Sequence, residues 1–131
     1  MATSAAGSGD DLAALRAEIQ ADPLILYFDT AQASINLTAA QRNKVSKISR
    51  YMDKVDNAIT NVVGHTDNTS GRSGNMTLGK KRAEFAKRFL VQNGINSNQI
   101  RTSSKGPDQP IASNASEAGR AKNRRVEVTI N

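Results

Sequence analysis

An acid and a base stand at a spacing that suits ligand binding. Asp67 ends the run Gly64-His65-Thr66-Asp67, and Arg82 follows fifteen positions later. An aspartate can hold an ammonium group, and the planar fork of an arginine can hold a carboxylate in a way that lysine cannot reproduce. The pair could therefore clamp a zwitterion such as the free end of an amino acid.

The surroundings of Arg82 argue against a merely solvated cation. On a helix of 3.6 residues per turn, Arg82 falls inside an apolar arc. That arc is made of Leu78, Phe85, Ala86 and Phe89. The other charged residues of the segment fall on the opposite side: Lys80, Lys81, Glu84, Lys87 and Arg88. We therefore expect Arg82 on the buried face, in the first turn of a helix whose free amides also attract anions.

The remaining pattern predicts the strands and helices that position this pair. A short leading helix is expected over residues 10–21, followed by a core over 24–130. Strands are predicted at 24–28, 58–64, 100–104 and 124–130, and two longer helices at 38–55 and 77–92. Thr38 and Gln41 fit a capping box at the start of the first of these. The polar stretches 68–75 and 106–123 are predicted to be loops.

This order, β-α-β-α-β-β, predicts an α/β (α+β) sandwich in which a mixed four-stranded sheet carries helices on one face. Asp67 then lies at the carboxyl end of a strand, where ligands of open α/β sheets tend to bind. Residues 10–131 are interpreted as one domain. Residues 1–9, small and polar, are interpreted as a linker or an expression scar.

Composition limits the chemistry. The net charge of +6 favours acidic partners, but the sequence has no aromatic-rich strand and no zinc-ligand spacing that would support nucleic-acid binding. Absence of cysteine excludes disulfides and thiolate metal sites, and His65 is the only histidine. Neither a metal nor a cofactor is expected, and no apolar run is long enough for a membrane span.

Several motifs, in their shared order and spacing, resemble the OmpA-like peptidoglycan-binding domain over residues 24–130. They are Phe28-Asp29, Gly64-His65-Thr66-Asp67 and the stretches 75–83, 110–114 and 119–128. This family includes the C-terminal domains of outer-membrane protein A, the peptidoglycan-associated lipoprotein and the flagellar stator subunit MotB. The resemblance therefore implies the OmpA-like fold and non-enzymatic, non-covalent binding to the stem peptide of the cell wall.

The resemblance also implies a ligand and a location. Asp67 and Arg82 match the residues that hold the ammonium and the carboxylate of meso-diaminopimelate. Further contacts are expected from Asp29, Thr69, Asn75 and Arg124. The protein is expected in the periplasm of a Gram-negative bacterium, tethering an outer-membrane or other envelope protein to peptidoglycan. Membrane attachment is expected only through an N-terminal anchor or barrel outside this sequence, and the oligomeric state is left open. Ala31 departs from the family, which often has a polar side chain there.

Alternatives stand beside these assignments. Asp67 could cap its loop through an Asx-turn, and Arg82 could form a structural salt bridge with Asp67 or Glu127. His65 fits a packing residue at a strand end. A peptidoglycan hydrolase could use His65 and Asp67 as acid and base, although no motif supplies a nucleophile or second carboxylate. A basic nucleic-acid binder would rely on the C-terminal segment.

Overall fold

The structure, a computed structural model, describes residues 4–131 and the side chains from residue 11 onward. The elements, in order, are α1 (Ser4–Ala21), β1 (Leu24–Tyr27), α2 (Ala39–Lys54), β2 (Thr60–His65), α3 (Arg72–Gln92), η1 (Ser97–Gln99), β3 (Ile100–Gly106), α4 (Glu117–Asn123) and β4 (Arg125–Ile130). Of the predicted linker, residues 1–3 lie outside the described residues and residues 4–9 belong to α1. Within the described range, no helix combines the length and hydropathy needed to cross a membrane.

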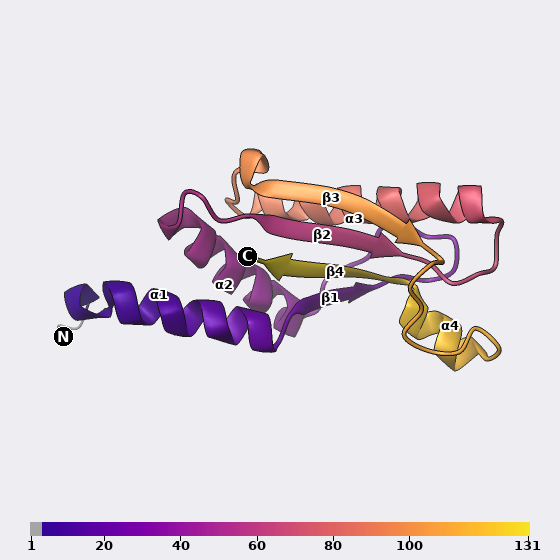
Figure 1. Ribbon diagram of the computed structural model, residues 1–131, viewed down its shortest axis with the longest axis horizontal. Helices are drawn as coiled ribbons and strands as arrows, with labels where there is room; N and C mark the ends of the chain where they lie inside the picture. Colours follow the sequence, from indigo (N-terminus) through magenta and orange to yellow (C-terminus); the bar gives the residue numbers. More distant parts are fainter. Residues whose placement is uncertain (1–3) are drawn as a thin grey trace.

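The four strands form one mixed sheet in the order β1-β4-β2-β3 (Figure 1). Strands β2 and β3 pair in parallel, whereas β4 lies between β1 and β2 and is antiparallel to both. The predicted mixed four-stranded sheet is confirmed. Because β4 runs against its two neighbours, the carboxyl ends of β1 and β2 and the start of β4 meet at one end of the sheet.

Alternate strand residues build the core. They point to the face that α2 and α3 cover, and both helices lie behind the sheet in Figure 1. The strand side of this core contains Leu24, Leu26, Val62, Val126 and Val128, each no more than 2% exposed. The helix side contains Val45, Ile48, Met52, Ala83, Ala86 and Leu90. This single apolar layer fixes α2 and α3 against the strands whose ends carry the candidate site.

Helix α2 begins where the sequence predicts. Thr38 Oγ1 accepts a hydrogen bond from the Gln41 amide at 3.1 Å, and Gln41 Oε1 accepts one from the Thr38 amide at 2.9 Å. The predicted capping box is therefore present. Gln41 Nε2 also donates to Ile25 O on β1 at 3.0 Å, so the cap ties α2 to the outer edge of the sheet.

Helix α3 begins at Arg72, five residues before the predicted start. Arg82 therefore lies about three turns into the helix rather than in its first turn. The expectation that free amides at the helix start would reinforce Arg82 is wrong. The helix packs so closely on β2 that a Cβ at Gly64 would overlap the carbonyl oxygen of Gly79. This close approach brings Arg82 next to the end of β2.

The predicted loop over residues 106–123 contains a helix, α4. Ser116 caps it, because its Oγ accepts a hydrogen bond from the Gly119 amide at 3.0 Å. The buried residues of α4 are Gly119 and Asn123, neither of which is apolar. The segment consequently lacks the apolar periodicity by which sequence patterns reveal helices. In Figure 1, α4 lies at the end of the sheet where β4 begins.

Candidate functional site

The candidate site lies where β1 and β2 end and β4 begins. Asp29 follows β1, Asp67 follows β2 and Arg124 immediately precedes β4. An open groove of about 1110 Å³ lies at this end of the molecule, and we call it the loop groove. Its lining residues include Asp29 and Gln32 after β1, Thr38 before α2, Glu117 of α4, and Arg124. The topology therefore places Asp29 and Arg124 on the wall of the loop groove, whereas Asp67 and Arg82 are not among its lining residues.

Arg82 is fully buried, with 0% of its surface exposed, as its position in the apolar arc predicts. Its guanidinium donates to three backbone carbonyls: Gln32 O at 2.8 Å, His65 O at 3.0 Å and Asp29 O at 3.1 Å. It also lies 5.3 Å from the ring centroid of Phe28. The predicted alternative of a salt bridge to Asp67 or Glu127 is wrong, because those carboxylates pair with Arg124 and Arg125.

The Arg82 cation is poorly compensated. Burial lowers its pKa to about 10, the negative charge of Asp67 opposes this change, and the positive charge of Arg124 adds to it. A guanidinium has five N–H donors, and the hydrogen bonds to the three carbonyls use three of them. Arg82 thus retains both positive charge and donor capacity for a further anionic group.

The loop after β1 supplies two of the carbonyls that hold Arg82. Between Asp29 and Gln32, Ala31 adopts a φ of 63°, in the left-handed region that favours glycine. Such backbone strain of about 1–3 kcal/mol persists where the surrounding contacts determine the conformation, often near binding sites. The hydrogen bonds from Arg82 to Asp29 O and Gln32 O are contacts of this kind. They join the wall of the loop groove to the buried cation.

Asp67 is also buried, at 5% exposure, and both of its carboxylate oxygens have partners. Oδ1 accepts from the Thr69 amide at 2.9 Å, which is the Asx-turn that the sequence allowed. Oδ2 accepts from Arg124 Nη1 at 3.2 Å. Burial by itself raises the pKa of Asp67, but the hydrogen bonds from Thr69 and Arg124 outweigh it and hold the pKa below the usual value. Asp67 is therefore ionised at neutral pH.

Arg124 connects the parts of the site. It donates from Nε to Phe28 O at 2.9 Å, from Nη1 to Asp67 and from Nη2 to Glu117 at 2.9 Å. The sequence prediction placed Arg124 near the pocket but did not identify Glu117. The available signal was Ser116 followed by Glu117, an N-cap with an acid in the first helical turn. Recognising α4 would have located this carboxylate.

The other two predicted contacts support the loop after β2. Thr69 is exposed and binds Asp67 through its amide. Asn75 is 2% exposed, lies within α3 and donates from Nδ2 to Ser70 O at 2.6 Å. The structure therefore brings Asp29, Asp67, Arg82 and Arg124 together, whereas Thr69 and Asn75 hold the loop that carries Asp67.

His65 ends β2 and is 1% exposed, as expected for a packing residue at a strand end. Neither ring nitrogen has a hydrogen-bond partner, and Nε2 lies 3.8 Å from Glu127 Oε1. Burial lowers its pKa from 6.5 to about 4, and the charge of Arg125 acts in the same direction, whereas Glu127 opposes it. Among the described residues, no three His, Asp or Glu side chains are grouped so as to hold a metal ion.

We expect acid to destabilise the fold through His65. Between its folded pKa of about 4 and its unfolded pKa of 6.5, the unfolded chain binds more protons. The free energy of unfolding should therefore fall by about 2 kcal/mol as the pH is lowered to about 5, with little further loss from this residue below its folded pKa. Urea unfolding of the wild type and His65→Phe at several pH values measures this effect. Equal pH dependence in the two proteins would show that His65 is not the cause.

The comparisons with known proteins agree with this architecture. The OmpA family matches residues 27–124. The chain is 35% identical over 108 residues to the probable lipoprotein YiaD of Escherichia coli, across 82% of this chain and 48% of that protein. It is 35% identical over 96 residues to the peptidoglycan-binding protein ArfA of Mycobacterium tuberculosis, across 73% of this chain and 29% of that protein. This chain thus spans less than half the length of either relative.

Solved structures show the same fold. The peptidoglycan-associated lipoprotein from Burkholderia pseudomallei superposes with a TM-score of 0.74 at 27% identity, across 82% of this chain and 89% of that one. The C-terminal domain of Helicobacter pylori MotB superposes with a TM-score of 0.66 at 32% identity, across 84% of each chain. The likeness covers most of each compared structure.

Proposed function

Because this chain belongs to the OmpA family, we propose that it binds peptidoglycan and holds it through the meso-diaminopimelate of the stem peptide. Family membership makes the chain a non-enzymatic binding domain. In this proposal the domain tethers an envelope protein to the cell wall, in the periplasm of a Gram-negative bacterium. A stem peptide reaches the site through the loop groove.

The observation that carries the proposal is the buried Arg82 guanidinium without a carboxylate partner. Burying an unpaired charge costs free energy. An anionic ligand that pairs with Arg82 would recover part of this cost, which favours its binding. The carbonyls that Arg82 contacts belong partly to Asp29 and Gln32, which line the loop groove. A ligand carboxylate that enters between these residues would meet the remaining guanidinium donors.

The ammonium of diaminopimelate would be held by carboxylates on the other side of the site. Asp29 is exposed in the loop groove, and Asp67 is joined to the groove through Arg124, which lines it. Glu117 gives Arg124 a second carboxylate partner, so Arg124 remains neutralised when the ligand ammonium shares Asp67. The site thus offers a zwitterion an acid and a base that do not form an ion pair with each other.

The expected strength of a single contact is modest. Hydrogen bonds to charged groups contribute about 1.5–3 kcal/mol each, so two or three of them give micromolar to millimolar affinity for one stem peptide. Retention on the wall then depends on the many equivalent stem peptides of the polymer and on any further domains of the tethered protein.

The hydrolase alternative is not supported by the geometry. An acid or base must lie within hydrogen-bond reach of the proton that it transfers. The His65 ring is closed off from solvent and makes no hydrogen bond, and both Asp67 oxygens are already engaged.

Ligand preference tests the proposal. A soluble stem tripeptide that ends in meso-diaminopimelate should bind at least about tenfold more tightly than the same peptide ending in lysine. The reason is that lysine lacks the second carboxylate, which loses one charge-assisted hydrogen-bonded contact. Isothermal titration calorimetry measures both affinities.

Purified sacculi, free of protein, provide the matching polymer experiment. The domain should co-sediment with diaminopimelate-type sacculi, and the diaminopimelate peptide should release it more effectively than the lysine peptide. Equal affinity for the two peptides would contradict the assigned role of Arg82, and no co-sedimentation at all would contradict wall binding.

A further inference from the structure

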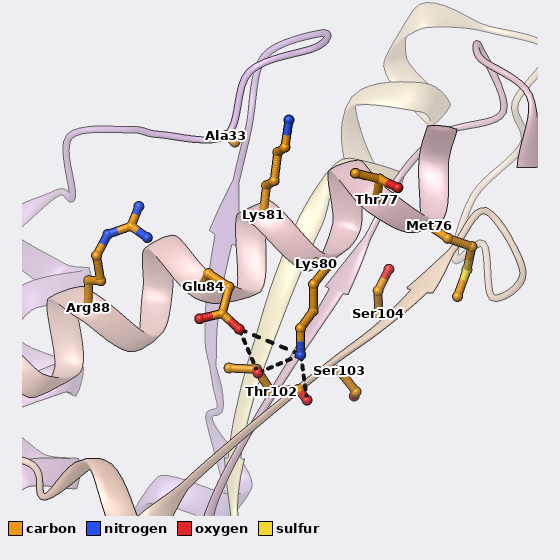
Figure 2. Close-up of a pocket in the computed structure, with 10 residues that line it drawn as sticks. All are labelled: Ala33, Met76, Thr77, Lys80, Lys81, Glu84, Arg88, Thr102, Ser103 and Ser104. Carbon is orange, nitrogen blue, oxygen red and sulfur yellow. Dashed lines mark hydrogen bonds and ion pairs between the residues drawn. The ribbon is translucent and has the colours of Figure 1, made fainter. Parts of the chain in front are cut away.

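A second cavity lies between α3 and β3, the edge strand of the sheet (Figure 2). It is a shallow groove of about 890 Å³, and we call it the helix groove. Its charged lining residues are Lys80, Lys81, Glu84 and Arg88 of α3, and Thr102 and Ser104 of β3 form the other wall. The lining residues of the helix groove include none of the residues that line the loop groove.

Two of the four charges satisfy each other. Lys80 Nζ donates to Thr102 Oγ1 at 2.8 Å and to Thr102 O at 3.2 Å, and it lies 3.5 Å from Glu84 Oε2. Thr102 Oγ1 in turn donates to Glu84 at 3.0 Å. Figure 2 shows these three side chains converging on one point. Lys80 and Glu84 therefore leave little net charge in the groove.

Lys81 and Arg88 remain uncompensated. Both are exposed, and their charged ends point away from the Lys80 cluster in Figure 2. No ion pair within the described part of the chain includes Lys81 or Arg88, so neither cation has a carboxylate partner there. The helix groove thus presents two free cations at separated points on one helix.

We propose that the helix groove binds an acidic, extended peptide segment of a partner protein, independently of wall binding. Lys81 and Arg88 lie seven positions apart, about 10 Å along the axis of α3. An extended peptide rises about 3.3 Å per residue and points alternate side chains the same way, so acids at alternate positions can reach both cations. The carbonyl and hydroxyl of Thr102 are already engaged by Lys80 and Glu84, so the peptide is held through Lys81 and Arg88.

Other anionic partners fit this groove less well. Single-stranded nucleic acid is held by aromatic stacking as well as by charge, and none of the described residues that line the groove is aromatic. A lipid surface would require apolar side chains that insert beside the cations, whereas Ala33 and Met76 are the only apolar lining residues described, and both are partly buried. Charge complementarity in a groove therefore favours an acidic peptide.

Fluorescence anisotropy with a labelled peptide of four Glu-Ser repeats tests the proposal, with four Gln-Ser repeats as the neutral probe. The wild type should bind only the acidic peptide, and more weakly as salt increases. A Lys81→Gln and Arg88→Gln double variant should bind it about tenfold more weakly, the expected effect of losing two exposed charge contacts. The matched control, Arg50→Gln with Lys54→Gln on exposed positions of α2, removes the same charge and should bind as the wild type does.

Three results would overturn the proposal. Equal weakening in the two double variants would show binding through general positive charge. Tighter binding of a single-stranded oligonucleotide or of anionic phospholipid vesicles, abolished by the groove variant, would assign the groove to another class of partner. A parallel loss of sacculus binding in the groove variant would make the groove part of the wall-binding surface. Circular dichroism establishes that each variant is folded.

Discussion

Replacing Arg82 with alanine should lower the free energy of unfolding by about 3 kcal/mol. The substitution removes three charge-assisted hydrogen bonds and leaves a cavity between α3 and the loop after β1. Relief of the buried charge offsets part of this loss, which is why the expected value is smaller than the sum of the contacts. Urea denaturation at neutral pH measures the change. A loss below about 1 kcal/mol would show that the carbonyl contacts do not stabilise this loop.

Arg82→Lys separates the charge from the geometry. Lysine keeps the positive charge, but its single ammonium nitrogen cannot span the carbonyls of Asp29, Gln32 and His65 or present a planar fork to a carboxylate. The variant should be less destabilised than Arg82→Ala and should still fail to co-sediment with sacculi. Retention of wild-type wall binding by Arg82→Lys would show that a positive charge alone is sufficient.

Asp67→Asn should weaken ligand binding strongly while leaving the protein folded. Asparagine keeps an oxygen that can accept from the Thr69 amide, so the Asx-turn is retained. The variant loses the negative charge that faces the ligand ammonium in the proposed binding mode, while Arg124 keeps Glu117 as its partner. The expected weakening for the diaminopimelate peptide is about 30-fold, corresponding to about 2 kcal/mol for a charge-assisted contact.

The matched control for this experiment is Asp53→Asn, at an exposed position of α2. It removes the same charge away from both grooves and should bind sacculi as the wild type does.

The effect of Asp67→Asn on binding should also disappear in acid. The pKa of Asp67 lies below its usual value of 3.8, so its carboxylate becomes protonated only below that pH. The wild type and Asp67→Asn should therefore bind alike only there. Equal binding of the two variants at neutral pH would contradict a ligand role for Asp67.

The sequence predicted those features that depend on local pattern. Thr38 and Gln41 reveal the start of α2 because a capping box is formed within four residues. Arg82 is buried as its helical arc indicates, because that arc depends only on spacing along one helix. The strands lie within a few residues of their predicted bounds, and the mixed sheet follows from the order of the elements.

The features that the sequence did not predict depend on tertiary contacts. The polar residues and glycines at 70–74 are typical of a loop, yet the first turn of α3 includes Gly74. In α4, Asn123 takes the place of an apolar core residue. Its side chain bonds to the amides of Ile111 and Ala112 and to Ala112 O, all more than ten residues away. The carbonyl partners of Arg82 at Asp29 and Gln32 are likewise distant, so spacing cannot reveal them.

The position of β4 has a consequence for biosynthesis. Among the described strands, β1 pairs only with β4. Leu24 is paired with Val128, although the two residues stand near opposite ends of the sequence. A nascent chain that contains β1, α2 and β2 but not yet β4 therefore has no means of closing its sheet. Such distant pairings make folding slow and leave apolar strand faces exposed in the meantime. The sheet therefore closes only once residues 125–130 are available to pair, and the apolar strand faces stay exposed until then.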